Sequence, residues 1–495
     1  MLDRTKIEAL RNARVPQSGH VIDGVARAAS DGGTLEVISP LDGKVLTTMA
    51  CGTKDDADRA IAAARRAFDD GRWSGMAPAQ RKKILLAWAD LIENEALELA
   101  VLGVRNNGTE IGMALKAEPL SAVGTIRYYA EALDKLYGEI APTGPDVLGL
   151  VHREPVGVVG AIVPWNFPLM IGSWKFAPAL AAGNTMVLKP AETASLTLVR
   201  LAELAIEAGM PPGVFNVVTG KGSVVGEAIA LSMDVDVLVF TGSGPVGRRL
   251  LEYAARSNLK RVYLELGGKS PNIVFADAPD LAEAAKVSAG GIFRNSGQVC
   301  VAASRLLVER SIHDEFIEAL AGVAKSMKVG DPLDPSTAAG AVNSLTQLEQ
   351  NLGFVDEARA LGRDIRIGGS RILEETGGYY MAPTIVTGVA PTDRLARDEV
   401  FGPVLAVIPF DTEEEAIQIA NGTDYGLAAA VWTGDLSRAH RMVRAIKAGV
   451  VHVNTYGGSD ITVPLGGVKQ SGNGHDKSLH AFDKYLDLKT AWIKL

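Results

Sequence analysis

Short apolar segments alternate with helical segments from about residue 185 onward, and this alternation restricts the fold more than any other feature of the sequence. The first series has strand-like runs at 185–188, 214–218 and 235–240, with a helical pattern at 197–208. A second series begins near residue 270, with strand-like runs at 272–275, 305–308, 404–410 and 428–431. Strands that alternate with helices build parallel sheets, which bind ligands at the carboxyl ends of their strands. We therefore predict an α/β fold with a ligand site at such an edge.

The chain has 495 residues, more than one hydrophobic core supports, so we expect two or three domains. A strand with a hairpin turn at 37–43 leads into helical patterns at 57–68 and 81–102. Residues 148–163 are rich in β-formers, and the tail 482–495 alternates enough to form a last strand. Because the sequence offers that strand no obvious partner, we expect it to pair with another subunit.

The charge pattern and the cysteine count argue against several classes of protein. The net charge of −8 is spread without long single-sign runs, which argues against binding to nucleic acid. The N-terminal segment lacks the apolar core of a signal peptide, and no apolar run approaches the roughly 20 residues that span a bilayer. The two cysteines cannot form a disulfide framework, and no Cys/His cluster has zinc spacing. We expect a cytoplasmic protein with neither a membrane nor a metal partner.

Cys300 is the first candidate for a reactive side chain. It lies between small and β-branched residues, with Gly297 three positions before it, so a substrate has room to reach the sulfur. A thiolate is a good nucleophile where its surroundings depress the thiol pKa. An isolated cysteine is more often an inert small side chain in a core, so this stretch alone favours no reaction.

A glycine-rich turn follows the strand-like run that ends at residue 240. Gly242, Gly244 and Gly247 satisfy the spacing G-x-G-x-x-G, and a helical pattern covers 248–255. A pyrophosphate could rest at the N-terminus of that helix. The alternative is a tight strand–helix turn without a ligand, which Pro245 would stiffen.

Two positions compete for the role of ribose partner. Glu265 stands about 20 residues after the glycine-rich turn, where a dinucleotide fold places its acidic residue. It precedes Gly267 and Gly268, however, which favours a close backbone approach at a domain junction. Lys189 and Glu192 are the better candidates, because they follow the strand at 186–188 and could both bond ribose hydroxyls. For that pair alone, a solvated salt bridge is an equal alternative.

Seven motifs in a fixed order resemble the aldehyde dehydrogenase superfamily over nearly the whole chain. They lie at 164–168, 189–192, 240–243, 264–269, 297–300, 399–403 and 464–472. The resemblance implies a Rossmann-like NAD-binding domain, an α/β catalytic domain and a small oligomerisation element that builds dimers or tetramers. Their expected bounds are 1–132 with 151–266 for the first, 267–465 for the second, and 133–150 with 466–495 for the third.

By this resemblance Cys300 is the nucleophile for an aldehyde. Attack gives a thiohemiacetal, and loss of hydride to the cofactor then leaves a thioester. The Asn166 amide and the Cys300 backbone N–H would hold the oxyanion, and Glu265 would activate the water that hydrolyses the thioester. Asn166 alone could equally be a turn residue.

The resemblance also assigns a cofactor cleft. Its residues are Trp165, Lys189, Glu192, Gly242, Ser243, Gly247, Glu399 and Phe401. Glu399 resembles the residue that holds the nicotinamide ribose. A carboxylate at Glu192 would repel a 2′-phosphate, so we expect NAD, with NADP possible.

Further stretches at 129–139, 436–442 and 471–481 resemble bacterial enzymes of polyamine catabolism. That subgroup oxidises gamma-glutamyl-gamma-aminobutyraldehyde, 4-guanidinobutyraldehyde and related omega-amino aldehydes, and close relatives act on indole-3-acetaldehyde. The expected substrate-lining residues are Met170, Trp174, Lys175, Val301 and Asp460. Asp460 would favour a cationic substrate end, unless it only makes local backbone bonds in its loop. Helix packing for Trp174 and a solvated helix face for Lys175 are the alternatives there.

One stretch departs from the family, and several other functions compete. Residues 105–110 read Arg-Asn-Asn-Gly-Thr-Glu where the family often has Asp-x-Gly-Lys-Pro, at positions that border the substrate entrance in relatives. A broad-range aldehyde dehydrogenase, a CoA-dependent acylating relative and a non-catalytic structural protein are alternatives. A cysteine hydrolase is another, although it would need a histidine base, and the nearest in sequence is His313.

Overall fold

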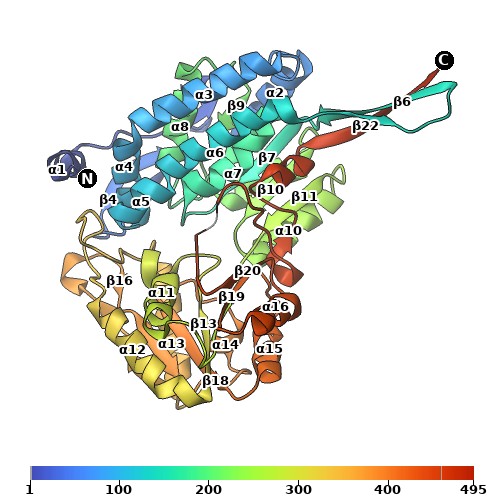
Figure 1. The fold of residues 1–495 in the computed structure, drawn as a ribbon. Helices are drawn as coiled ribbons and strands as arrows, with labels where there is room; N and C mark the ends of the chain where they lie inside the picture. The colour runs from blue at the N-terminus through green and yellow to red at the C-terminus, as the bar shows by residue number, and fades with distance from the viewer. Residues whose placement is uncertain (1–2, 459) are drawn as a thin grey trace.

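An eight-stranded sheet and a seven-stranded sheet organise this computed structural model, which describes residues 3–458 and 460–495 (Figure 1). The strand order of the first sheet is β2-β1-β9-β8-β7-β10-β11-β21. Its strands are β1 (His20–Ile22), β2 (Val25–Arg27), β7 (Val158–Ile162), β8 (Thr185–Lys189), β9 (Phe215–Val217), β10 (Val237–Thr241), β11 (Arg261–Glu265) and β21 (Gly472–Asn473). The five strands from β9 to β11 are parallel, which confirms the α/β prediction.

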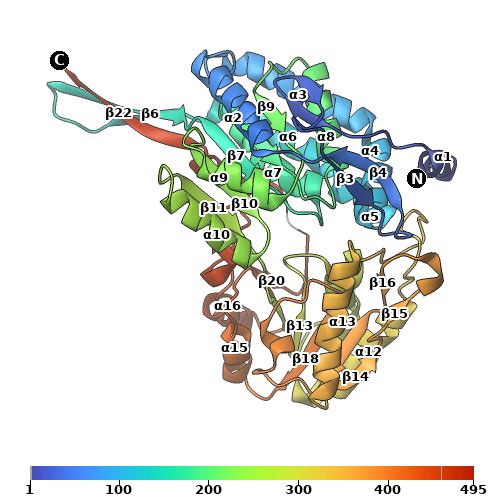
Figure 2. The ribbon, with the colours of Figure 1, turned by 180° about the vertical axis from the view of Figure 1, so that it is seen from behind.

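Helices cover both faces of the first sheet because successive side chains of its buried strands point to opposite sides. On one face, Val159, Met186 and Val237 pack with the helices α3, α6, α7 and α8. On the other, Val158, Val187 and Leu238 pack with α2, α9 and α10, in front in Figure 2. The bounds are α2 (Lys54–Asp69), α3 (Pro78–Asn94), α6 (Pro119–Ala132), α7 (Pro168–Ala181), α8 (Leu196–Glu207), α9 (Glu227–Leu231) and α10 (Gly244–Ala255).

The second sheet has the order β14-β17-β18-β13-β12-β19-β20 and is also covered on both faces. Its strands are β12 (Pro271–Val274), β13 (Arg305–Glu309), β14 (Asp364–Ile367), β17 (Thr384–Thr387), β18 (Val404–Phe410), β19 (Ala428–Trp432) and β20 (Val450–Val453). One face packs against α11 (Leu281–Phe293) and α12 (His313–Ser326). The other packs against α13 (Leu345–Ala360), α15 (Glu413–Asn421) and α16 (Leu436–Ala445).

Smaller elements complete the chain. They are α1 (Arg4–Asn12), β3 (Thr34–Ile38), β4 (Val45–Ala50), α4 (Ala96–Asn107), α5 (Ile111–Ala117), β15 (Arg371–Ile372), β16 (Tyr380–Met381) and α14 (Arg394–Arg397). The expected hairpin at 37–43 joins β3 to β4. The helical pattern at 81–102 is divided between α3 and α4 at Glu95.

The C-terminal strand β22 (Leu486–Lys494) forms a projecting sheet with β5 (Glu139–Ala141) and β6 (Val147–Pro155), seen at the upper right of Figure 1. This strand has a partner in its own chain, which the sequence did not indicate, and its pairing with another subunit stays a prediction. It pairs antiparallel with β6 over nine residues, from Leu486 opposite Pro155 to Lys494 opposite Val147. The residues before it lie elsewhere: β21 pairs with β11, and Phe482 packs in the core of the first sheet.

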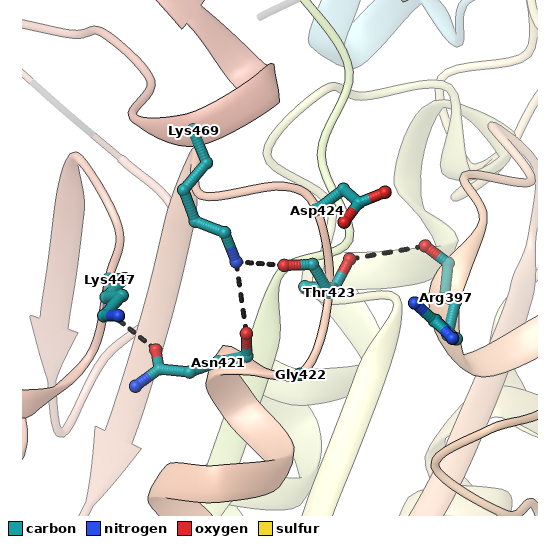
Figure 3. A pocket seen from close by; sticks show the side chains of 7 residues that line it. All are labelled: Arg397, Asn421, Gly422, Thr423, Asp424, Lys447 and Lys469. Carbon is teal, nitrogen blue, oxygen red and sulfur yellow. Dashed lines mark hydrogen bonds between the residues drawn. The ribbon is translucent and has the colours of Figure 1, made fainter.

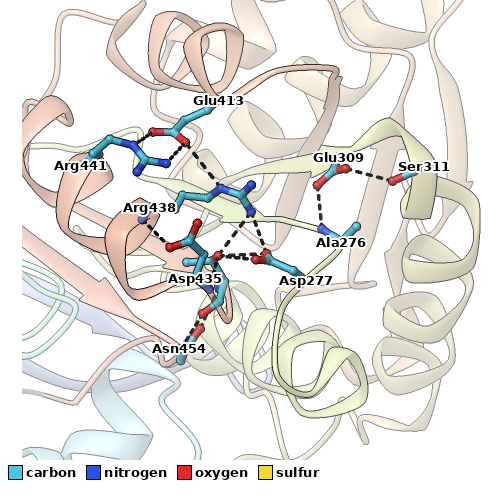
Figure 4. A network of polar contacts seen from close by, with 10 residues as sticks. Ala276, Asp277, Glu309, Ser311, Glu413, Asp435, Arg438, Arg441 and Asn454 are labelled. Atoms are coloured by element: carbon cyan, nitrogen blue, oxygen red, sulfur yellow. Dashed lines mark hydrogen bonds and ion pairs between the residues drawn. The ribbon is translucent and has the colours of Figure 1, made fainter.

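Polar side chains bridge the carboxyl ends of three strands in the second sheet (Figure 4). Asp277 follows β12 and accepts hydrogen bonds from the Thr433 hydroxyl and the Arg438 guanidinium, both at 2.9 Å. The Asn454 side chain, after β20, accepts one from the Thr433 backbone N–H at 3.0 Å. Glu413 pairs with Arg438. Polar groups that follow three strands therefore bind one another at this edge.

The interior of the second sheet depends on a buried cation, Arg305. Its guanidinium donates to the carbonyl oxygens of Lys269 (2.9 Å), Ile419 (2.8 Å) and Ala420 (2.7 Å). Burial lowers the pKa of Arg305 to about 10, so the guanidinium stays charged at neutral pH. These bonds join the loop before β12 to the end of α15.

We expect Arg305→Leu to lower the free energy of unfolding by about 3 kcal/mol, because three buried carbonyls would lose their donor. Arg310→Leu is the control, since Arg310 pairs with Asp411 at the surface and its loss costs about 1 kcal/mol or less. Urea titration of both variants measures the difference. Equal midpoints for the two variants would contradict the assigned role of Arg305.

Candidate active site

The candidate site lies where two sheet edges meet. Asn166 and Glu265 stand at the carboxyl ends of β7 and β11 in the first sheet. Cys300 and Glu399 precede β13 and β18, at the amino end of the second sheet. The first sheet therefore contributes the carboxyl ends of its strands, where a parallel sheet is expected to bind a ligand. The second sheet contributes the amino ends of its strands.

The loop after Glu265 joins these groups. The Gly268 backbone N–H donates to Oε1 of Glu399 at 2.9 Å. A Cβ atom on Gly267 would lie 2.1 Å from the Glu399 carboxylate, and one on Gly268 would lie 2.6 Å from the Cys300 carbonyl oxygen. The predicted close backbone approach at Gly267 and Gly268 is therefore confirmed.

The chain reaches Cys300 through three consecutive residues in the left-handed region. Their φ angles are 48° for Asn295, 51° for Ser296 and 71° for Gly297. Left-handed backbone costs a non-glycine residue about 1–2 kcal/mol. Gly297 also tolerates no side chain, since a Cβ atom there would lie 2.1 Å from the carbonyl oxygen of Gly402. Surrounding hydrogen bonds must hold this turn.

Asn166 lies against the nucleophile loop. Its side-chain Nδ2 donates to the carbonyl oxygen of Gln298, two residues before Cys300, at 2.9 Å. The Gln298 side chain in turn donates to the Asn295 carbonyl at 3.0 Å and accepts from the Asn343 backbone N–H at 2.8 Å. A side-chain amide has two N–H groups, so Asn166 retains one for an oxyanion.

The surroundings of the Cys300 sulfur favour the neutral thiol. Burial raises the pKa of the thiol to about 12, and the negative charges of Glu399 and Glu265 act in the same direction. The backbone N–H groups of Val301 and Cys300 lower the pKa by less. The depressed thiol pKa that would make a ready thiolate is therefore not found in this arrangement.

Glu265 is buried beside an ion-paired cluster. Asp476 lies between two lysines and pairs with Lys175 through one oxygen and with Lys484 through the other. Burial and the Asp476 charge raise the pKa of Glu265 well above its usual value, while Lys175 and Lys484 lower it. Lys175 is therefore fully buried in an ion pair, and the alternative of a solvated face for it is wrong. Oε1 of Glu265 has no hydrogen-bond partner among the described residues.

The predicted ribose pair is in contact. Lys189 is buried, and its Nζ lies 3.3 Å from Oε2 of Glu192, while Oε1 of Glu192 accepts from the Gly222 N–H at 2.6 Å. Burial lowers the pKa of Lys189. Glu192 remains partly exposed, so the pair can meet a ligand.

The glycine-rich turn and an aromatic pair complete the cofactor side. Ser243 precedes α10 and is exposed. A Cβ atom on Gly242 would lie 2.4 Å from the Phe240 ring, and one on Gly247 would lie 2.9 Å from the Leu266 side chain. Trp165 and Phe401 meet edge to face, with ring centroids 5.2 Å apart. A helix N-terminus, a lysine–carboxylate pair and aromatic walls fit a dinucleotide.

The predicted substrate-lining residues have partners that the sequence did not indicate. The Met170 N–H donates to the buried Glu118 at 2.8 Å, and burial raises the pKa of Glu118 to about 8. The Val301 carbonyl accepts from the Tyr456 hydroxyl at 2.5 Å. Nζ of Lys477 lies 5.8 Å from the centroid of the half-buried Trp174 ring.

Asp460 makes the local backbone bond that was the alternative to a role in substrate selection. Its Oδ1 accepts from the Thr462 N–H at 2.9 Å. That bond lowers the pKa of Asp460, and the positive charge of Lys477 contributes. Asp460 is therefore an exposed carboxylate with a cation nearby. Lys477 and Asp476 both lie in the stretch 471–481, whose sequence indicated a family resemblance and no ionic contacts.

A separate surface pocket of about 470 Å³ contains none of these residues (Figure 3). It is lined by Arg397, Asn421, Gly422, Thr423, Asp424, Lys447 and Lys469. Nζ of Lys469 donates to the carbonyl oxygens of Asn421 and Thr423.

Within residues 3–458 and 460–495, no group of three or more His, Cys, Asp or Glu could hold a metal ion, and no helix is long and apolar enough to cross a membrane.

Comparison with known proteins agrees with this geometry. A sequence model of the aldehyde dehydrogenase family matches residues 27–491. The NADP/NAD-dependent aldehyde dehydrogenase PuuC of Escherichia coli is 50% identical over 474 residues, covering 96% of this chain and 95% of PuuC.

Two solved structures superimpose over the full length of both chains. An indole-3-acetaldehyde dehydrogenase in complex with NAD+ has a TM-score of 0.98 at 52% identity. A gamma-glutamyl-gamma-aminobutyraldehyde dehydrogenase from Burkholderia cenocepacia has a TM-score of 0.97 at 50% identity. The resemblance that the motifs indicated is confirmed, and the chain belongs to the aldehyde dehydrogenase family.

Proposed function

We propose that this protein oxidises an aldehyde to the carboxylic acid with NAD, using Cys300 as the nucleophile. The observation that carries the proposal is the meeting of two sheet edges, which brings Cys300, Asn166 and Glu265 together beside groups that fit a dinucleotide. The relatives that act on aldehydes with NAD support it. A cysteine hydrolase is disfavoured, because no hydrogen bond among the described residues joins Cys300 to a histidine, and His313 pairs with Asp314.

The chain's own residues account for most of the mechanism. The deprotonated sulfur of Cys300 attacks the aldehyde carbon, and the resulting oxyanion accepts hydrogen bonds from the free N–H of Asn166 and the Cys300 backbone. Bound NAD supplies the acceptor for the hydride that this adduct loses. Ionised Glu265 then takes a proton from a water molecule that attacks the thioester, which releases the acid and the sulfur of Cys300.

The remaining predicted residues bind the cofactor. Lys189 and Glu192 bind the adenine ribose, Gly242, Ser243 and Gly247 place the pyrophosphate at the N-terminus of α10, and Trp165 and Phe401 border the cleft. Glu399 binds the nicotinamide ribose. The Glu192 carboxylate disfavours a 2′-phosphate, so NAD is preferred and NADP is tolerated.

The proposed substrate is an omega-amino or guanidino aldehyde. Met170, Trp174 and Val301 line the path to the sulfur, and the exposed Asp460 attracts the cationic end. The gamma-glutamyl-gamma-aminobutyraldehyde dehydrogenase and PuuC support a polyamine-derived substrate. The indole-3-acetaldehyde dehydrogenase supports the alternative, an aromatic aldehyde.

Assembly is part of the proposal. Residues 1–132 and 151–266 form the cofactor domain, to which β21 and Phe482 are added. Residues 267–465 form the catalytic domain, and 133–150 with the rest of 466–495 form the oligomerisation element. Ile140, Leu488 and Trp492 on the projecting sheet are between 65% and 74% exposed, so this sheet offers an apolar surface to a second copy in a dimer or tetramer. A cytoplasmic location suits a thiol that must stay reduced.

The first test follows absorbance at 340 nm with NAD or NADP and four aldehydes: 4-aminobutyraldehyde, 4-guanidinobutyraldehyde, indole-3-acetaldehyde and propanal. We expect reduction of NAD with the cationic aldehydes and none with Cys300→Ala, because that variant lacks the sulfur that forms the adduct. Cys51→Ala is the control and keeps activity. A preference for indole-3-acetaldehyde would overturn the substrate class, and no reduction with any pair would overturn the function.

We expect the turnover number to rise with pH over a range well above the usual titration range of a glutamate, because the raised pKa of Glu265 keeps the carboxyl protonated, and inactive as a base, at lower pH. Glu265→Gln should remove this pH limb and lower kcat by about 100-fold. A first-turnover burst of NADH should remain, since thioester formation does not use Glu265. Glu227→Gln, a carboxylate bonded to Tyr253 in the same domain, is the control. Loss of the burst in Glu265→Gln would contradict the role in hydrolysis.

Asp460→Asn tests substrate selection, because asparagine keeps an oxygen for the Thr462 N–H and loses only the charge. The ratio of kcat/KM for 4-aminobutyraldehyde to that for propanal should fall about two- to fivefold, the range of an exposed ion pair. Asp483→Asn, an exposed carboxylate near Arg153, is the control. An unchanged ratio in Asp460→Asn would show that Asp460 has only its local bond.

A further inference from the structure

Residues 106–110, at the end of α4 and before α5, form a polar stretch that is buried. Asn106, Asn107, Thr109 and Glu110 are each exposed by 4% or less. Buried polar side chains are costly unless they are hydrogen-bonded. The contacts of these four therefore indicate what the stretch does.

The first set of contacts reaches the oxyanion side of the site. Nδ2 of Asn107 donates to the backbone carbonyls of Trp165 and Asn166, both at 3.4 Å. Oδ1 of Asn107 accepts from the Thr109 N–H at 3.1 Å, which fixes the orientation of the amide. Asn107 therefore holds the backbone of the residue that offers the oxyanion donor.

The second set reaches the nucleophile side. The Thr109 hydroxyl donates to Oδ1 of Asn295 at 2.9 Å, and the Asn295 N–H donates to Oε1 of Glu110 at 3.3 Å. Asn295 is the first of the three left-handed residues before Cys300. The side chain and the backbone of that residue are thus both held from this stretch.

These contacts close into a ring. Nδ2 of Asn295 donates to the Gln298 carbonyl at 3.3 Å, and the same carbonyl accepts from Nδ2 of Asn166. The ring thus runs from Asn107 to Asn166, Gln298, Asn295 and Thr109, and back to Asn107. Every link is a hydrogen bond within one buried region.

A neighbouring loop fixes the ring in place. A Cβ atom on Gly340 would lie 2.0 Å from the Gly108 carbonyl oxygen, so the two backbones are in direct contact. The Ser296 hydroxyl donates to the Gly340 carbonyl at 2.8 Å. The stretch and the left-handed turn are therefore supported by the same loop.

We propose that Asn107, Thr109 and Glu110 are positioning residues that fix the Asn166 amide relative to the Cys300 sulfur. The inference rests on the proposed function, in which these two groups act on one carbonyl. The residues act through Asn166 and Asn295 and do not touch the substrate.

The test compares Thr109→Val and Glu110→Ala with Thr185→Val. Valine keeps the shape of threonine and removes its hydroxyl, and Thr185 is an equally buried threonine whose hydroxyl donates to the Ala64 carbonyl, away from the site. Glu110→Gln keeps an acceptor for the Asn295 N–H and should recover most of what Glu110→Ala loses. Three quantities are measured: kcat with an aldehyde, the dissociation constant of NAD, and the rate at which iodoacetamide alkylates Cys300 without substrate, resolved from Cys51 by mass spectrometry.

We expect Thr109→Val to lower kcat about tenfold or more and to change the alkylation rate at least about fivefold, with NAD affinity within about twofold of the parent. Thr185→Val should lower thermal stability and leave kcat and the alkylation rate within about twofold. Smaller effects in Thr109→Val, or equal effects in Thr185→Val, would overturn the inference. If Glu110→Ala does not fold, the result for Thr109→Val alone tests the positioning role. A parent without NADH formation would overturn the proposed function alone, since the alkylation rates still decide the positioning role.

Discussion

Three consecutive left-handed residues carry the chain to Cys300, and the candidate site depends on that turn. Asn295 and Ser296 adopt a backbone that side chains disfavour, and Gly297 has no room for a side chain beside Gly402. Such a conformation persists only where its surroundings over-determine it. Both halves of the molecule supply those surroundings, since Asn166 comes from the first sheet and Asn343 from the segment before α13.

The electrostatics of the site are arranged around carboxyl groups. Glu265 and Asp476 are buried and Glu399 is partly buried, with two lysines paired to Asp476 and none paired to Glu265 among the described residues. Negative neighbours and burial keep the Cys300 thiol protonated. A resting thiol is less open to oxidation than a resting thiolate, so this arrangement protects the sulfur of Cys300.

Much of the fold and the main residues of the candidate site could be predicted from sequence, for a physical reason. Parallel strands buried on both faces are continuous apolar runs, and the motifs around Cys300, Glu265 and Asn166 are local. The contacts that hold the site residues in place join segments that are far apart in sequence. Asp476 meets Lys175 across about 300 residues of sequence, and nothing near either residue indicates the partner. Ser296 gives no signal of a left-handed backbone, and the polar stretch 106–110 resembles a surface turn until its burial is known.

The pairing of β22 with β6 has a consequence for how the protein is made. β6 lies in the first third of the sequence, and its partner β22 is synthesised about 330 residues later. Until then one edge of the β5–β6 hairpin keeps its backbone groups open to other strands, a known route to aggregation. Completion of the projecting sheet therefore waits for the synthesis of β22, and the surface proposed for assembly cannot exist on a nascent chain that lacks this strand.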